Sequence, residues 1–131
     1  MAKILVIDDE EQIRKHFQTL LPHLGHTVCT AADGDEGILA AKDEDIQLII
    51  TDLCMPGTLS ETELVRELRL LRPKVPIVVI SGYPSGDALM ACEEIGVTDF
   101  LTKPFELSFI AAILEKAFGT PSQSGAAGGH R

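Results

Sequence analysis

The sequence predicts an α/β fold, in which a parallel sheet of five strands carries helices on both of its faces. Five short apolar runs alternate along the chain with five segments in which apolar residues recur at helical spacing. The runs Leu48 to Ile50 and Val78 to Ile80 show no polar alternation, which is typical of strands buried on both faces. Alternation of strand and helix implies right-handed crossovers, so every strand-to-helix loop opens on the same edge of the sheet.

The amino-terminal half of the chain supplies three strands and two helices. We expect strands at Lys3–Ile7, His26–Thr30 and Ile46–Asp52, and helices at Glu10–Leu24 and Glu36–Lys42. Ile13, Phe17 and Leu24 lie on one face of the first helix, and Gly25 follows as a C-cap. Asp33-Gly34 then turns the chain between the second strand and the second helix.

The carboxyl-terminal half supplies the remaining two strands and three helices. Strands are expected at Val75–Ile80 and Thr98–Thr102, and helices from the N-cap Ser60 to Leu71, at Asp87–Ile95 and at Glu106–Phe118. Residues 120–131 are dominated by Gly, Ala, Ser and Pro and have no apolar period. We therefore expect one folded domain over residues 1–119, followed by a flexible tail or the start of a linker.

The composition restricts the classes of function. The 131 residues carry a formal charge of −9, from 11 basic and 20 acidic residues, which argues against binding to nucleic acid or an anionic membrane. No apolar run approaches the ~18 residues of a membrane span, and the short start before Asp8 is no signal peptide, so we expect a cytoplasmic protein. Cys29, Cys54 and Cys92 are unpatterned and predict neither a zinc site nor a disulfide framework.

Polar residues follow four of the five predicted strands, at the edge where the loops open. They are Asp8-Asp9, Asp52, Ser81 and Lys103. Carboxylates held close together repel one another unless a cation lies among them, and Mg²⁺ is the natural cation for oxygen ligands. With Lys103 as a second positive charge and Ser81 as a hydroxyl donor, Asp52 is a candidate nucleophile that forms an aspartyl phosphate.

The residues next to this cluster suit the same chemistry. Gly82 follows Ser81 and leaves room where a side chain could block a phosphoryl group. The Lys103–Pro104 peptide bond is a candidate for the cis form in a tight turn. The acids Glu10 and Glu11 are explained as the start of a helix, where the helix dipole is positive. His16, His23 and His26 have mixed spacing, form no ligand set and are expected at the surface.

Taken in order, these motifs resemble the response-regulator receiver domain (CheY-like) of two-component signalling. The resemblance covers about Lys3 to Phe118, and each motif is weak alone but specific in combination. The motifs are Asp8-Asp9, Asp52 with Met55-Pro56, Ser81-Gly82 and Lys103-Pro104-Phe105. The resemblance implies a flavodoxin-like, doubly wound fold with five helices and the strand order 2-1-3-4-5.

The resemblance also implies a role for each matching residue. Asp52 matches the phosphoacceptor, Asp9 a direct metal ligand, and Asp8 its partner, often acting through water. Cys54 matches a position whose backbone carbonyl binds the metal, so its thiol is not expected to be the ligand. Lys103 matches the phosphate-binding lysine. Ser81 matches the switch hydroxyl, and Phe100 the aromatic switch position that rotates as Ser81 moves.

Implied partners are a sensor histidine kinase or phosphotransfer protein upstream, and a downstream protein or a domain beyond residue 131. We expect no enzymatic activity beyond the domain's own phosphorylation and dephosphorylation. The switched surface is implied to be the fourth helix, fifth strand and fifth helix. Dimerisation through the fourth and fifth helices is not expected, because family members that dimerise in this way usually have a basic last helix and residues 106–118 contain only Lys116 as a base. The loop at residues 58–62, with Ser60 where the family usually has glycine, departs from the pattern.

Three other functions remain as alternatives. A phosphatase with an aspartate nucleophile would require a second acid at the position of Cys54. A flavin-binding flavodoxin would require a phosphate loop rich in Ser, Thr and Gly, where Asp8-Asp9 would repel phosphate. A receiver-like module that acts without phosphorylation typically lacks part of the acid set, which is complete in this chain.

Overall fold

The computed structural model describes residues 2–53, 61–82 and 85–118, and in this part of the chain strands and helices alternate. The strands are β1 (Lys3–Ile7), β2 (Thr27–Ala31), β3 (Ile46–Asp52), β4 (Ile77–Ser81) and β5 (Asp99–Thr102). The helices are α1 (Glu11–His23), α2 (Gly34–Ala41), α3 (Glu61–Leu71), α4 (Gly86–Ile95) and α5 (Leu107–Phe118). All strand pairs are parallel, in the order β2-β1-β3-β4-β5. The predicted fold and strand order are confirmed.

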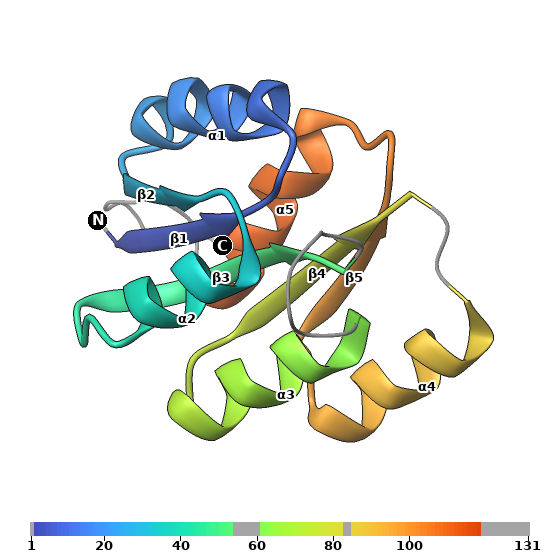
Figure 1. Ribbon diagram of the computed structural model, residues 1–131. Coiled ribbons are helices and arrows are strands. Elements are labelled where there is room, and N and C mark those ends of the chain that lie inside the picture. Colours follow the sequence, from blue (N-terminus) through green and yellow to red (C-terminus); the bar gives the residue numbers. More distant parts are fainter. Residues whose placement is uncertain (1, 54–60, 83–84, 119–131) are drawn as a thin grey trace.

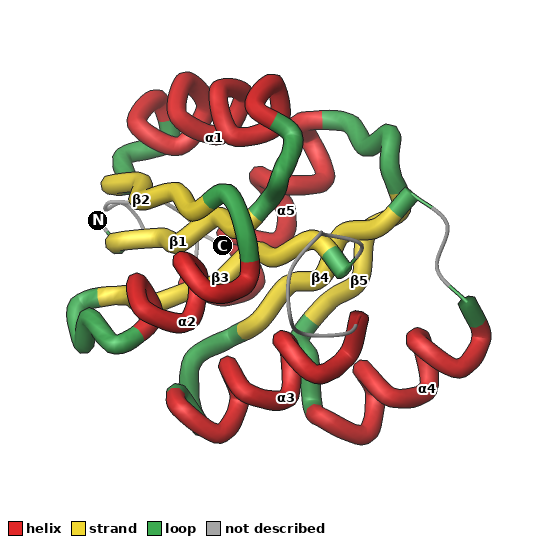
Figure 2. Tube along the Cα trace, viewed as in Figure 1, coloured by secondary structure: helices red, strands yellow, loops and turns green. Residues whose placement is uncertain are grey.

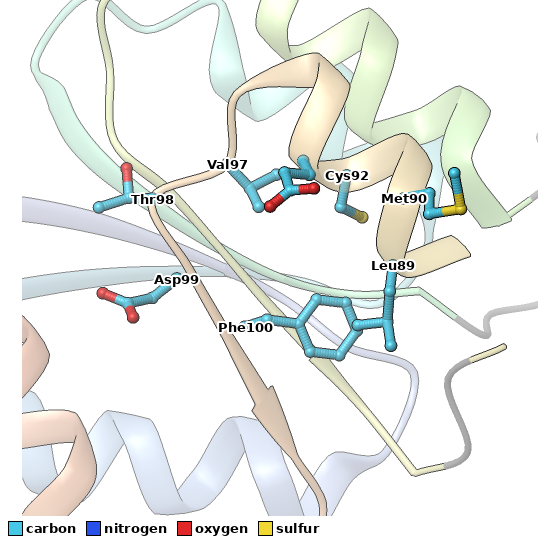
Figure 3. Close-up of a pocket in the computed structure, with 8 residues that line it drawn as sticks. Leu89, Met90, Cys92, Val97, Thr98, Asp99 and Phe100 are labelled. Carbon is cyan, nitrogen blue, oxygen red and sulfur yellow. The ribbon is translucent and has the colours of Figure 1, made fainter. Parts of the chain in front are cut away.

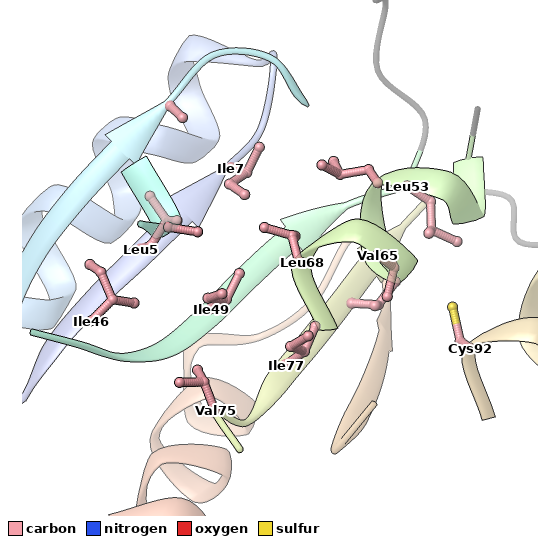
Figure 4. Close-up of a cluster of buried hydrophobic side chains, with 14 of the residues drawn as sticks. Leu5, Ile7, Ile46, Ile49, Leu53, Val65, Leu68, Val75, Ile77 and Cys92 are labelled. Atoms are coloured by element: carbon pink, nitrogen blue, oxygen red, sulfur yellow. The ribbon is translucent and has the colours of Figure 1, made fainter. Parts of the chain in front are cut away.

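Helices cover both faces of the sheet (Figures 1 and 2), and an apolar layer lies between the sheet and the helices on each face. Successive residues of β1 point to opposite layers, so Leu5 and Ile7 join one cluster and Ile4 and Val6 join the other. Figure 4 shows the first cluster, which α2, α3 and α4 cover. The second cluster lies under α1 and α5. Because both faces are covered, the central strands β3 and β4 are buried at every residue except Gln47, and their unalternated runs Leu48 to Ile50 and Val78 to Ile80 are buried as the sequence predicts.

Local chemistry explains where the observed elements depart from the predicted bounds. Strand β4 begins at Ile77 and not at Val75, because Pro76 has no N–H to donate to a ladder; its carbonyl still accepts from Ile49 N at 3.0 Å. Helix α2 begins at Gly34, since the Asp33 side chain accepts a hydrogen bond from the Glu36 N–H and caps the first turn. The predicted N-cap Ser60 lies outside the described residues.

Helix α2 approaches β1 closely at a glycine. A Cβ atom placed on Gly37 would lie 2.5 Å from Ile7 Cδ1, well inside van der Waals contact. At Gly34, three residues earlier, a Cβ would meet Leu64 Cδ1 at an ordinary 3.5 Å. The packing distance between α2 and the sheet therefore depends on the missing side chain at Gly37.

Two arginines, Arg69 in α3 and Arg72 directly after it, bind backbone carbonyls at the edge of the sheet opposite the polar cluster. Arg72 donates to four backbone carbonyls at the end of α2 and in the loop to β3: Ala41, Asp43, Glu44 and Ile46, at 3.1, 2.8, 3.4 and 2.9 Å. Arg69 donates to Val75 O and to Gly96 O, both at 2.8 Å. Two of these carbonyls, those of Ala41 and Gly96, lie at the ends of α2 and α4, where the last carbonyls of a helix lack partners within it; the others lie in the loops before β3 and β4 or at the start of β3.

The ends of α4 follow the expected capping chemistry. Gly96 has a φ of +93°, and its N–H donates to Cys92 O and Glu93 O. This left-handed residue ends α4. Among the described helices, none has the length and apolar character that crossing a membrane requires.

Candidate phosphorylation and metal site

The carboxyl ends of the strands bring the predicted polar residues to one edge. Asp52 is the last residue of β3 and is paired with Ile80, next to Ser81, which ends β4. Asp8 follows β1, and its N–H donates to Ala31 O at the end of β2 at 3.1 Å. Lys103 follows β5, and its N–H donates to Ser81 O at 2.8 Å. Parallel strands in register therefore place residues separated by 95 positions around one point.

Packing between two aromatic rings holds the loop that carries Lys103 in place. The Phe105 ring lies 5.9 Å from that of Phe17, a fully buried residue of α1. The Lys103–Pro104 peptide bond is cis, as predicted. A half-buried aromatic side chain directly after Pro104 thus anchors the turn to the apolar layer under α1 and α5.

The Lys103 ammonium lies among three carboxylates. Its Nζ is 2.9 Å from Asp52 Oδ2 and 3.1 Å from Asp8 Oδ2, and it also donates to Glu10 Oε2. Asp8 and Asp52 are almost fully buried, at 0% and 3% exposure, whereas Asp9 is exposed. Burial alone would lower the pKa of Lys103, but its hydrogen bonds with Glu10, Asp52 and Asp8 outweigh burial and raise this pKa above its usual range.

Asp8 has a buried carboxylate whose charge is only partly compensated by its neighbours. Its Oδ1 accepts a hydrogen bond from the Glu10 N–H at 2.8 Å, but no described residue gives its buried Oδ2 a hydrogen bond of good geometry, despite the nearby lysine. Burial raises the pKa of Asp8, and the charge of Asp52 raises it further, while the Glu10 N–H and Lys103 lower it. One ammonium is therefore insufficient compensation for two buried acids.

The acids at this edge form a group that fits a divalent cation. Four carboxylates each offer one oxygen, and these oxygens lie within 4.8 Å of one another: Asp8, Asp9, Glu10 and Asp52. A hard cation such as Mg²⁺ prefers oxygen ligands of this kind. The Oδ2 of Asp8 supports this fit, because it is buried and has no hydrogen-bond partner among the described residues, and a cation would add to the compensation that Lys103 gives it from 3.1 Å.

Glu10 is the residue that the sequence reasoning misses as part of the site. It was expected to serve only the start of α1, and it does precede that helix as its N-cap, but its side chain makes no cap hydrogen bond. The side chain turns instead to Lys103. The sequence clue is its place directly after Asp8-Asp9, which keeps it at the same edge of the sheet.

The other predicted residues have different outcomes. Ser81 is fully buried at the end of β4. Cys54, the expected carbonyl ligand, lies outside the described residues, as do Met55-Pro56. Phe100 is half-buried on β5 and lines a pocket of about 390 Å³ between α4 and β5 together with Leu89 (Figure 3). The rotation of the Phe100 ring remains a prediction.

A second cleft lies directly beside Lys103. It has a volume of about 450 Å³ and is lined by residues of α1 and of the loops after β4 and β5, including His16, Gly82 and Phe105. No described atom lies within 4 Å of a Cβ placed on Gly82, so this side of the site has the expected room.

His26 differs from its predicted surface position: it is half-buried, and its Nδ1 accepts a hydrogen bond from Ala2 N at 3.1 Å.

The comparison with known protein families agrees with this arrangement. The model of the response regulator receiver domain matches residues 4–115. The chain belongs to this family. The matched range contains all of the polar residues at the site described above, and the predicted family is confirmed.

Individual relatives support the assignment of this receiver domain. The transcriptional regulatory protein YkoG of Bacillus subtilis, itself uncharacterized, is 32% identical over 114 residues, which are 87% of this chain and 50% of YkoG. Chemotaxis protein CheY4 of Vibrio cholerae has a TM-score of 0.81 at 30% identity, over 90% of this chain and 99% of CheY4. TrrA of Thermotoga maritima, solved in complex with Mg(2+)-BeF, has a TM-score of 0.79 at 25% identity, over 90% and 100%.

The chain spans half or less of the length of the first curated relatives it matches, with coverage of 50%, 42% and 14% of their sequences. By contrast, it matches structures of receiver domains over nearly their whole length. The shared part is thus the receiver domain.

Proposed function

We propose that this receiver domain is a phosphorylation switch, in which a histidine kinase or phosphotransfer protein phosphorylates Asp52 in a Mg²⁺-dependent reaction. The observation that carries the proposal is the position of Asp52, with its Oδ2 2.9 Å from Lys103 Nζ and inside a group of acids that fits a divalent cation. Receiver domains of this family are typically phosphorylated on an aspartate, and the Mg(2+)-BeF complex of TrrA supports a similar site in this chain.

The chain's own residues supply much of what phosphoryl transfer requires. The bond between phosphorus and the imidazole nitrogen of the donor breaks, and a bond forms between phosphorus and an Asp52 carboxylate oxygen. Lys103 holds positive charge beside that oxygen and stabilises the charge that develops on the phosphoryl group. Buried surroundings strengthen this interaction, because Asp52 is only 3% exposed.

Four residues are proposed to hold the metal ion. Asp9 and Asp52 are the direct carboxylate ligands, the backbone carbonyl of Cys54 is a further ligand, and Asp8 acts through water. When bound, Mg²⁺ supplies charge neutralisation at the phosphoryl oxygens. Asp8 and Asp52 are both buried, so a bound ion would also reduce the repulsion between these two carboxylates.

We propose that Ser81 and Phe100 transmit the change to a surface made by α4, β5 and α5. Ser81 is paired with Thr102 of β5, two residues along the strand from Phe100. Phe100 in turn lines the α4–β5 pocket with Leu89 and Met90 of α4, which are 43% and 63% exposed. Phosphorylation would shift the population between two packings of this surface.

Output is proposed to pass through a downstream protein or through a domain that follows residue 131, with the receiver domain acting in the cytoplasm. The second form of output is supported by the relatives, several of which are transcriptional regulators that are about twice as long as the matched segment. The domain itself is proposed to act on no substrate other than its own phosphoryl group.

Incubation with Mg²⁺ and acetyl phosphate, followed by intact mass measurement, tests the proposal. We expect the addition of one phosphoryl group, which hydroxylamine removes and which Asp52→Asn abolishes. Omission of Mg²⁺ should also prevent the modification. A modification that persists in Asp52→Asn would refute the assignment of the phosphoacceptor.

A further inference from the structure

The Lys103 ammonium lies within 3.1 Å of three carboxylates and donates a hydrogen bond to two of them, Glu10 and Asp52. The third carboxylate is that of Asp8. The lysine side chain is only 15% exposed, so water has little access to the donors. A phosphoryl group on Asp52 that is to pair with Lys103 must therefore replace one of these partners.

The three carboxylates differ in how much their charge would lose compensation if the Lys103 ammonium moved away. Asp8 has a fully buried side chain whose Oδ2 already lacks a well-formed hydrogen bond, so removing Lys103 would leave a buried charge without compensation. Asp52 is the residue that carries the phosphoryl group. Glu10 has a side chain that is 56% exposed, so water can solvate its carboxylate as soon as it leaves the lysine.

From this difference, and resting on the proposed role of Asp52, we propose that Glu10 is a gating residue of the phosphorylation site. It holds the Lys103 ammonium in the unphosphorylated domain and releases it to the phosphoryl group during transfer. Glu10 also places a negative charge beside the cleft at Gly82 and Lys103, where an anionic donor approaches. Both effects slow phosphorylation, and neither requires Glu10 to touch the reacting atoms.

The chain contains a matched control for this proposal. Glu11 is the next residue, carries the same charge and stands at the start of the same helix, but its carboxylate pairs with Lys15 at 3.6 Å, and both side chains are 69% exposed. Replacing either glutamate by glutamine removes one charge and keeps the shape. Only the Glu10→Gln change affects Lys103.

Kinetics with acetyl phosphate provide the first test. The bond between phosphorus and the acetyl oxygen breaks, a bond to an Asp52 oxygen forms, and acetate leaves. At saturating Mg²⁺, we expect Glu10→Gln to phosphorylate about two- to fivefold faster than the wild type, the range for one half-exposed ion pair. Glu11→Gln should match the wild type, and Asp52→Asn should show no modification.

The Mg²⁺ concentration is varied in each series because Glu10 belongs to the group of acids that fits a cation. If Glu10 were required as a metal ligand, Glu10→Gln would be slower at every Mg²⁺ concentration or would only reach the wild-type rate at saturation. Either result would overturn the gate. Modification of Asp52→Asn would instead overturn the phosphoacceptor assignment, so the two failures are distinguishable.

A second test measures the reactivity of the Lys103 amine in the absence of phosphorylation. Metal-free protein receives a short pulse of an amine-acetylating reagent, and peptide mass spectrometry compares labelling of Lys103 with that of Lys116. We expect Glu10→Gln and Glu10→Ala to increase labelling of Lys103 at least twofold, while Glu11→Gln leaves it unchanged. Faster phosphorylation with unchanged labelling would leave charge repulsion alone as the cause and would overturn the gate.

Discussion

Replacing Arg72 by methionine should destabilise the domain strongly, although the residue lies far from the phosphorylation site. Three of its four hydrogen bonds, those to Ala41, Asp43 and Ile46, are 3.1 Å or shorter, while the fourth, to Glu44 O at 3.4 Å, is long and contributes little. Each hydrogen bond contributes about 1 kcal/mol, because the group is only partly buried. The free energy of unfolding should therefore fall by about 2–3 kcal/mol.

Urea denaturation followed by circular dichroism measures this change. With a slope of about 1–3 kcal/mol per molar urea, the midpoint should fall by about 1–2 M. Methionine keeps much of the apolar stem of the side chain, so the loss reports the donors and not the packing. Arg66→Met is the matched control, because Arg66 is exposed on α3, the helix that ends directly before Arg72.

The reasoning would be refuted if Arg72→Met lost no more stability than Arg66→Met. Arg72→Lys separates charge from geometry, since a lysine retains the charge but lacks the planar fork that reaches several carbonyls together. We expect Arg72→Lys to recover less than half of the lost stability. Complete recovery would show that charge near the end of α2, and not the set of directed hydrogen bonds, is the stabilising factor.

Two further predictions concern the sheet. Gly37→Ala should lower the free energy of unfolding by about 1 kcal/mol or more, because the clash with Ile7 at 2.5 Å exceeds the gain in helix propensity. Gly34→Ala should not lower it, because a Cβ there meets Leu64 at an ordinary distance. Equal effects of the two changes in urea titrations would contradict this packing argument. In metal-free protein, the raised pKa of Asp8 makes its ionised form destabilising above that pKa, so wild type should gain stability relative to Asp8→Asn as pH falls from 7 towards the unfolded value of about 4. A difference between the two proteins that is independent of pH would show that the Asp8 pKa is not raised.

The sequence is sufficient to predict the sheet because apolar runs and turn residues determine it locally. The unalternated strands β3 and β4 can only be buried centrally, and the strand order then follows from the resemblance to the family. The same patterns place Asp8, Asp52 and Lys103 at one edge, which the structure confirms. Cys54 remains a prediction, because it lies outside the described residues.

The sequence does not reveal which side chains contact partners that lie far away along the chain. Arg72 reaches carbonyls 26 to 31 residues away, and nothing in its own segment indicates that it does so. Glu10 has the composition of an ordinary helix start, and only the fold brings Lys103, 93 residues later, within its reach. Contacts of this kind depend on the direction of one flexible side chain, which periodicity and capping rules do not specify.

The two edges of the sheet differ in their electrostatics: buried carboxylates repel each other at one edge, and arginine hydrogen bonds stabilise the other. At the carboxyl edge, Asp8 and Asp52 are buried with a single ammonium between them, and a cation bound there would reduce the repulsion between the two carboxylates. At the amino edge, Arg69 and Arg72 satisfy the carbonyls of three loops. A ligand that binds at the carboxyl edge relieves the repulsion and stabilises the folded state by mass action. Mg²⁺ should therefore stabilise the wild type more than Asp8→Asn, whereas the effect of Arg72→Met should be the same with and without the ion, because the two edges share no partner.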